Sequence, residues 1–91
     1  MTVKIIKLEK NHCPACVAMR PMLDSILEEY GDEVEFITIN VDKQPDAIGA
    51  YNLSGVPVLV FKNAAGEEKA RIVGMTAPAM VYAAIEKAKA E

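Results

Sequence analysis

Two cysteines, Cys13 and Cys16, are the residues of this 91-residue chain best suited to chemistry. They are its only cysteines, they are separated by Pro14 and Ala15, and they stand where a strand should end and a helix should begin. A C-x-x-C pair at such a junction in a small α/β chain is typical of a dithiol/disulfide redox centre. The pattern therefore predicts that the protein moves electrons and protons between thiols and disulfides.

The two sulfurs are expected to have different roles. Disulfide exchange needs a thiolate as its nucleophile. The first cysteine of the pair stands at a helix N-terminus, where free N–H groups favour an anion. We therefore expect Cys13 to attack, and Cys16, one turn further along and better buried, to resolve the mixed disulfide. Pro14 suits the first helical turn, because its missing N–H has no helical partner there.

Other uses of the cysteine pair have less support. Zinc needs four ligands, and only His12 could join the cysteines as a third strong ligand, at a spacing that matches no structural zinc pattern. Haem attachment requires C-x-x-C-H, whereas Val17 follows this pair. Inert core cysteines are a further alternative. We expect no metal and no bound cofactor beyond the redox-active pair itself.

Length and composition limit the class of protein. The chain is long enough for one domain, residues 1–91, and 52% of its residues are hydrophobic, which is enough for a packed core. The net charge of −3 and the lack of a basic cluster argue against a nucleic-acid partner. The N-terminus lacks a signal-peptide pattern, and the longest apolar run, Val56–Phe61, is too short to span a bilayer. We therefore expect a cytoplasmic monomer with no membrane partner.

The elements that must position the cysteines follow from residue periodicity. Four short runs are rich in β-branched residues and are expected to be strands: Val3–Leu8, Val34–Val41, Val56–Lys62 and Glu68–Val73. Helices are expected over Pro14–Tyr30, over Pro45–Tyr51 and from Pro78 onward. Pro21 should kink the first helix, and Gly31 should end it. The last helix is expected to bury Met80, Val81, Ala84, Ile85 and Ala88.

The resulting order, β-α-β-α-β-β-α, predicts an α/β fold. Its first β-α-β unit should be a right-handed parallel crossover. The closing hairpin then adds antiparallel strands, so the expected architecture is a four-stranded mixed sheet flanked by helices on both faces.

Several segments resemble the thioredoxin family. The run Cys13–Tyr30 is similar to the family's active-site helix, including its kinking proline, and Asn40–Pro45 and Tyr51–Asn63 are similar to the segments that follow. The resemblance covers nearly the whole chain, although the first strand and helix of full thioredoxins have no counterpart. It implies a thioredoxin fold and an enzyme that reduces protein disulfides. A flavin- or ferredoxin-dependent thioredoxin reductase would supply its electrons.

The same resemblance implies a substrate-binding surface around the cysteines. Pro57 should follow a cis peptide bond, so that the backbone of Val56 meets the substrate, and Gly74 matches the glycine after the last strand. A proline that merely starts a strand is the alternative at this position. The other residues of the expected surface are His12, Pro14 and Ala15.

Three positions depart from the thioredoxin pattern. His12 replaces the tryptophan before the first cysteine; a protonated imidazole would favour the Cys13 thiolate, and a solvated loop histidine is the alternative. Lys7 occupies the place of a buried aspartate, and Thr38 that of the aspartate's lysine neighbour. We expect Lys7 to reach toward Cys16, lower that thiol's proton affinity and stabilise the reduced state. Otherwise its amine should extend to solvent.

Lys10 raises an alternative within the same class of enzyme. It resembles the lysine that glutaredoxins use for the glutathione carboxylate. However, Gly55 stands in place of the glutaredoxin threonine before Val-Pro, and Met75 stands in place of one of the paired glycines that bind glutathione. A solvated lysine at the end of a strand is the favoured interpretation. A glutathione-dependent, glutaredoxin-like enzyme is therefore the second hypothesis. A binding module with a thioredoxin fold and a cluster carrier that uses Cys13 with glutathione are further alternatives.

Overall fold

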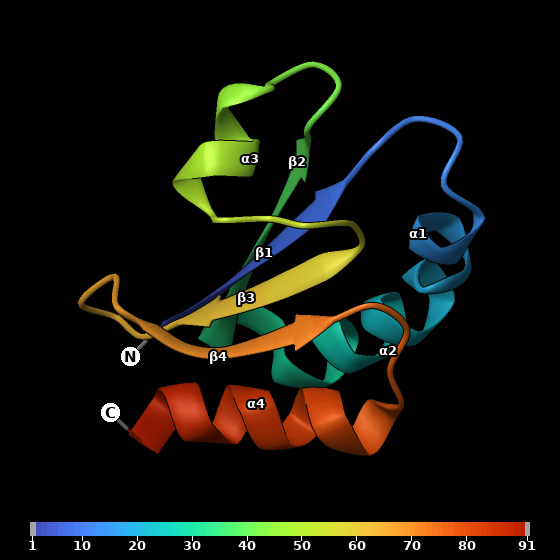
Figure 1. The fold of residues 1–91 in the computed structure, drawn as a ribbon. Coiled ribbons are helices and arrows are strands. Elements are labelled where there is room, and N and C mark those ends of the chain that lie inside the picture. The colour runs from blue at the N-terminus through green and yellow to red at the C-terminus, as the bar shows by residue number, and fades with distance from the viewer. Residues whose placement is uncertain (1, 91) are drawn as a thin grey trace.

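The computed structural model describes residues 2–90, which form one four-stranded sheet with helices on both faces (Figure 1). The strands are β1 (Val3–Glu9), β2 (Val34–Asn40), β3 (Val58–Lys62) and β4 (Glu68–Val73). The helices are α1 (Pro14–Ala18), α2 (Arg20–Tyr30), α3 (Asp46–Ala50) and α4 (Pro78–Ala90), with a 3₁₀ turn over Gly31–Glu33. None of the helices within residues 2–90 is long and apolar enough to cross a membrane.

The sheet has the strand order β2-β1-β3-β4. Strands β1 and β2 are parallel, whereas β3 is antiparallel to both β1 and β4. The predicted mixed sheet is therefore confirmed. Strand β3 begins at Val58, two residues later than predicted, because Pro57 has no N–H to contribute to the ladder. Central strand β1 is buried along most of its length and leads directly into the cysteine loop.

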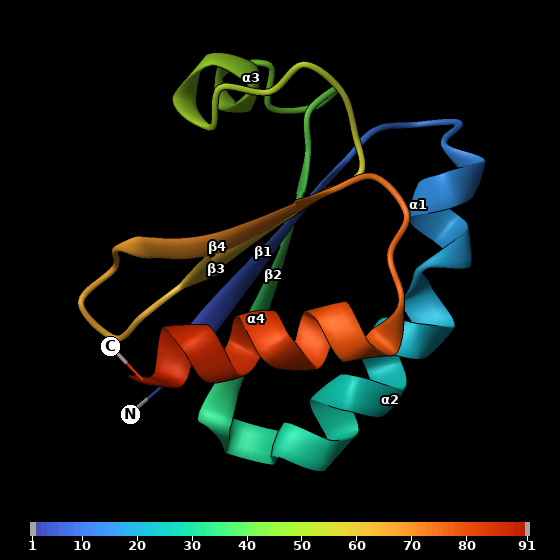
Figure 2. The same cartoon turned by 60° about the horizontal axis from the view of Figure 1, so that its bottom comes forward.

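The two faces of the sheet hold two apolar clusters. One lies between the sheet and the pair α2 and α4, and the other lies between the sheet and α3 (Figures 1 and 2). Successive side chains of a strand point to opposite faces. Ile5 therefore belongs to the α2 and α4 side, whereas Ile6 and Leu8 belong to the α3 side. By the same alternation, Lys7 and Glu9 share the face of Ile5.

The predicted first helix is divided at Met19. Pro21 cannot donate to the carbonyl four residues earlier, so the helical ladder is interrupted, and α1 ends at Ala18 before α2 begins at Arg20. The expected kink is thus a break between two helices. Gly31 follows α2 with a φ of +57°, a value that residues with a side chain rarely adopt.

The last helix departs from its predicted buried face at one residue. Val81, Ala84, Ile85 and Ala88 are buried, whereas Met80 is 59% exposed. The four buried positions already have the spacing of one helical stripe, and Met80 lies in the first turn at the edge of that stripe. The prediction that Met80 is buried is therefore wrong.

Candidate active site

A disulfide joins the two cysteines at the start of α1. The Sγ atoms of Cys13 and Cys16 are 2.20 Å apart, and the N–H of Cys16 donates to the Cys13 sulfur at 3.2 Å. Cys13 caps α1, and Pro14 occupies its first turn. Cys13 is 8% exposed and Cys16 is 1% exposed, which is the expected order. After reduction, the N–H aimed at Cys13 would favour a thiolate there.

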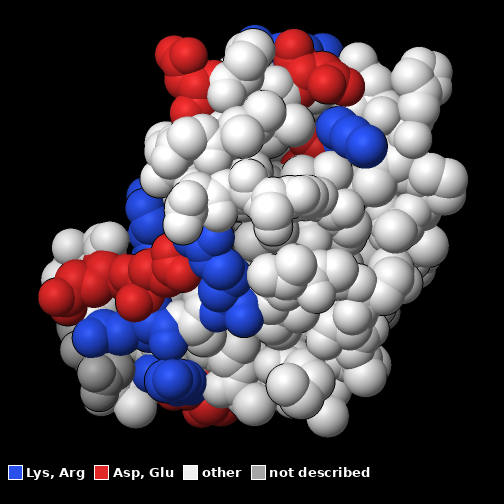
Figure 3. Space-filling model, in the orientation of Figure 1, with Lys and Arg blue, Asp and Glu red and all other residues white. Residues whose placement is uncertain are grey.

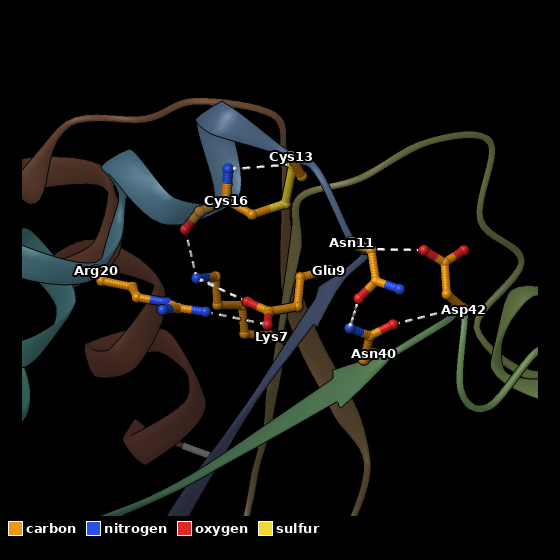
Figure 4. Close-up of a disulfide and its surroundings, with 8 residues drawn as sticks. All are labelled: Lys7, Glu9, Asn11, Cys13, Cys16, Arg20, Asn40 and Asp42. Atoms are coloured by element: carbon orange, nitrogen blue, oxygen red, sulfur yellow. Dashed lines mark hydrogen bonds and ion pairs between the residues drawn. A yellow bond between two sulfur atoms is a disulfide. The ribbon is translucent and has the colours of Figure 1, made fainter.

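Buried charges lie directly beneath the disulfide (Figure 4). The Nζ atom of Lys7 donates to the carbonyl oxygen of Cys16 at 2.6 Å and lies 3.1 Å from Oε1 of Glu9. The Lys7 side chain is 2% exposed and that of Glu9 is 10% exposed. The alternative in which Lys7 extends to solvent is therefore wrong. Its predicted reach toward Cys16 is confirmed, although the contact is with the backbone oxygen and not with the sulfur.

Glu9 is a site residue that the sequence reasoning missed. Its Oε1 atom is buried and accepts no well-aligned hydrogen bond, although the Lys7 amine lies within ion-pair distance. Its Oε2 atom lies 3.4 Å from Nη2 of Arg20. An isolated buried carboxylate would be strongly unfavourable, and Glu9 is not isolated, because Lys7 and Arg20 lie beside it. The alternation of Lys7 and Glu9 along one strand was the available signal, since it puts both on one face.

A network of amides and one carboxylate holds the loop that precedes Cys13. The N–H of Asn11 donates to Oδ2 of Asp42 at 2.9 Å, and Nδ2 of Asn40 donates to Oδ1 of Asn11 at 3.0 Å (Figure 4). These contacts tie the β1–α1 loop to the end of β2. His12 lies in this loop with a φ of +55°. Its imidazole is exposed and makes no hydrogen bond with the described residues, as the solvated-loop alternative requires.

The other predicted binding residues lie on two segments beside α1. The Val56–Pro57 peptide bond is cis, as the resemblance implied. The N–H of Gly74 donates to the carbonyl oxygen of Pro57 at 2.8 Å, which joins the segment before β3 to the loop after β4. Both segments lie next to α1 in the two ribbon views (Figures 1 and 2). The structure thus brings Val56, Pro57 and Gly74 to the same end of the molecule as the cysteines.

An open groove of about 780 Å³ runs beside the disulfide. Its walls come from the end of β1, the β1–α1 loop and the helices α1 and α2. Both cysteines contribute to it, as do Glu9, Lys10 and Arg20. Lys10 is exposed at the end of β1, in agreement with the interpretation of a solvated lysine.

The surface over α1 and the β4–α4 loop is almost uncharged in the view of Figure 3. Two large apolar side chains of these segments are exposed, Val17 at 55% and Met75 at 58%. Exposed apolar surface is typical of sites that contact another macromolecule. The disulfide therefore lies beside a surface suited to protein contact.

Comparison of the sequence with known proteins points to one family. The thioredoxin family model matches residues 2–87. The chloroplastic M-type thioredoxin of Spinacia oleracea is 33% identical over 76 residues, which cover 82% of this chain and 41% of that protein. The corresponding protein of Pisum sativum is 30% identical and covers 82% of this chain and 43% of its own length. This chain thus spans less than half the length of these curated relatives.

Solved structures give the same picture of the fold. Mitochondrial thioredoxin 3 from Saccharomyces cerevisiae, in its oxidised form, superposes with a TM-score of 0.82 at 25% identity, covering 92% of this chain and 76% of that one. A structure described as a malarial protein has a TM-score of 0.83 at 20% identity and covers 96% of this chain and 97% of its own. The second likeness supports the fold alone.

Proposed function

Because this chain belongs to the thioredoxin family, we propose that it is a thiol-disulfide oxidoreductase that reduces disulfides of other proteins through Cys13 and Cys16. The observation that carries the proposal is the bonded pair at the start of α1, in which Cys13 is the more exposed sulfur and accepts the N–H of Cys16. The uncharged surface beside the pair supports contact with protein substrates.

The reaction consists of two exchanges. The Cys13 thiolate bonds to one sulfur of the substrate disulfide, and the other substrate sulfur leaves as a thiolate that takes a proton from water. Cys16 then gives its proton to water and attacks Sγ of Cys13, so that the second substrate sulfur leaves as a thiolate. The substrate has gained two electrons, and the cysteine pair has lost them by forming its disulfide.

Neighbouring residues support each exchange. The N–H of Cys16 stabilises the Cys13 thiolate before the first attack. The Lys7 cation at the Cys16 carbonyl favours an anionic sulfur nearby before the second attack. In this proposal the backbone of Val56, held before Pro57, meets the substrate chain.

The oxidised pair must be reduced again by an external donor. We propose a flavin- or ferredoxin-dependent thioredoxin reductase as that donor. The cysteines themselves carry the electrons, so the proposal includes no bound cofactor, and it takes the protein as a monomer. A pair that works as a reductant needs a reducing compartment, for which we propose the cytoplasm.

Insulin reduction tests this function. The wild-type protein should reduce insulin when NADPH and a thioredoxin reductase supply electrons. Cys13→Ser should abolish turnover, and Cys16→Ser should accumulate the mixed disulfide with insulin. Wild-type turnover in Cys13→Ser would overturn the proposal. Turnover with glutathione in place of the reductase would favour the glutaredoxin-like alternative, and unimpaired biological function in Cys13→Ser/Cys16→Ser would favour a binding module.

The assignment of the nucleophile has its own measurement. Reduced protein treated with limiting iodoacetamide near neutral pH should be alkylated mainly at Cys13, because Cys13 is the more exposed thiol and has an N–H aimed at its sulfur. Peptide mapping by mass spectrometry gives the ratio of the two adducts. Predominant labelling of Cys16 would contradict the assignment.

A further inference from the structure

The groove beside the disulfide is a binding surface distinct from the one formed by Val56 and Pro57. Cys13 and Cys16 line it, but the segment before β3 does not. A substrate whose disulfide has reached Cys13 therefore has a second surface available on the β1 and α2 side of the sulfur. The charges in this groove indicate what kind of group that surface accepts.

The accessible charges of the groove are positive. The side chain of Arg20 is 57% exposed. Lys10 is exposed and makes no ion pair within residues 2–90. The only carboxylate in the wall, that of Glu9, is nine-tenths buried and already faces Lys7 and Arg20. The groove thus presents cations to solvent in a chain whose net charge is −3.

Arg20 still has free hydrogen-bonding capacity. Its contact with Glu9 joins a single nitrogen, Nη2, to Oε2 at 3.4 Å, which is long for a charge-assisted hydrogen bond. A guanidinium carries five N–H donors in a planar fork that fits a carboxylate. In Figure 4 the guanidinium of Arg20 points toward Glu9, beneath the disulfide. A carboxylate that enters the groove would meet the remaining donors of Arg20.

We propose that this groove is a carboxylate subsite, in which Arg20 and Lys10 bind an acidic group that the substrate carries close to its disulfide. The inference rests on the proposed function, because the bound group matters only if Cys13 reacts with that disulfide. The binding is non-covalent and leaves the two exchanges unchanged. The acidic group is a Glu or Asp side chain next to a substrate cysteine.

Three synthetic disulfide peptides of one sequence, with Glu, Gln or Lys next to the cysteine, test the subsite. The second-order rate constant for oxidation of the reduced protein is measured for each at low, fixed ionic strength. The wild type should react with the Glu peptide about threefold to tenfold faster than with the Lys peptide, the range expected for one or two exposed charge pairs. Added salt should reduce this ratio, because salt screens exposed charges.

Variants assign the preference to the groove. Arg20→Gln and Lys10→Gln should each lower the ratio of the Glu to the Gln rate constants toward one, whereas Lys87→Gln, an equal change of charge on distant α4, should leave the ratio as in wild type. The ratio would not respond to a merely structural role. Lys10→Gln keeps the test valid if Arg20→Gln disturbs folding, since Lys10 has no ion pair to lose within the described residues.

The outcomes separate this inference from the function on which it rests. Equal rates for all three peptides, or equal losses of preference in Lys87→Gln and Arg20→Gln, would overturn the subsite while the reductase proposal stands. No reaction even with the Gln peptide would overturn both.

Discussion

Two ion pairs in this protein have nearly the same length but very different surroundings. Beneath the disulfide, Lys7 and Glu9 are 3.1 Å apart, with side chains 2% and 10% exposed. Near the far end of α4, Lys89 and Glu33 are 3.0 Å apart, with side chains 33% and 52% exposed. Distance alone would rank the two pairs equally.

Burial makes these two pairs different. Water and salt screen an exposed pair, which then contributes little to stability. A buried pair has lost its hydration, so each charge depends on the other, and removal of one partner leaves an uncompensated charge. Two apolar residues in the same place would leave no charge to be compensated. The Lys7–Glu9 pair is therefore best explained by its position against Cys16, whereas the Lys89–Glu33 pair links α4 to the 3₁₀ turn that follows α2.

The largest predicted effect comes from breaking the buried pair. Lys7→Met keeps the bulk of the side chain but leaves the buried Glu9 with only the exposed Arg20 at 3.4 Å, which should lower the free energy of unfolding by about 3–5 kcal/mol. Urea denaturation of the oxidised protein measures the change. Lys89→Met is the matched control and should have a far smaller effect, because its partner Glu33 is solvated. Equal losses in the two variants would contradict the comparison.

Removal of both buried charges should recover most of the lost stability. In Lys7→Met/Glu9→Leu no uncompensated charge remains, so the free energy of unfolding should return to within about 2 kcal/mol of wild type. The residual loss reflects the Cys16 carbonyl, which no longer accepts the Lys7 amine. The same urea titrations give the coupling energy of the pair. A double variant no more stable than Lys7→Met would show that the cation acts mainly through Cys16.

The buried cation should also affect the redox couple. Lys7 favours an anionic sulfur near Cys16 and so stabilises the reduced state, which makes the couple more oxidising. The Cys13–Cys16 potential of Lys7→Met should be more negative by about 30–60 mV, equivalent to about 1.4–2.8 kcal/mol. Equilibration with glutathione or dithiothreitol buffers measures it. Lys89→Met should leave the potential unchanged, and an unchanged value in Lys7→Met would limit Lys7 to a structural role.

The smallest predicted effect belongs to the surface network. The hydroxyl of Tyr30 donates to Glu86 at 2.7 Å, and burial, followed by this bond, raises the pKa of Tyr30 to about 12. Because folding raises the pKa of Tyr30, its hydroxyl contributes to stability fully below pH 10, and this contribution is lost as the pH rises toward 12. Tyr30→Phe should therefore cost about 1 kcal/mol or less at neutral pH.

Urea denaturation across the alkaline range checks this dependence. The difference between the wild type and Tyr30→Phe should shrink as the pH rises from 10 to 12, because wild-type Tyr30 then loses its proton and its bond to Glu86. A difference that stays constant through this range would mean that the ring packing of Tyr30, and not its hydroxyl, provides the contribution.

The sequence by itself determined the chemistry and most of the fold. Cys13 and Cys16 are three residues apart, so their pairing needs no long-range contact, and apolar periodicity indicated the strands and helices in their order. The break at Met19 followed from the missing N–H of Pro21, which is also a local cause. The family resemblance supplied the cis bond at Pro57, because propensity alone does not distinguish the two isomers.

Only the tertiary structure decided what surrounds the cysteines. Glu9 and Arg20 are eleven residues apart, and their contact depends on how α2 packs against β1. The position of α1 beside β1 buries Lys7 against Cys16, and the groove opens beside the disulfide. Met80 was misplaced for a related reason, since a helical stripe indicates which side faces the core but not how far the buried side extends around the helix. Burial depends on neighbours distant in the chain, and no local pattern specifies them.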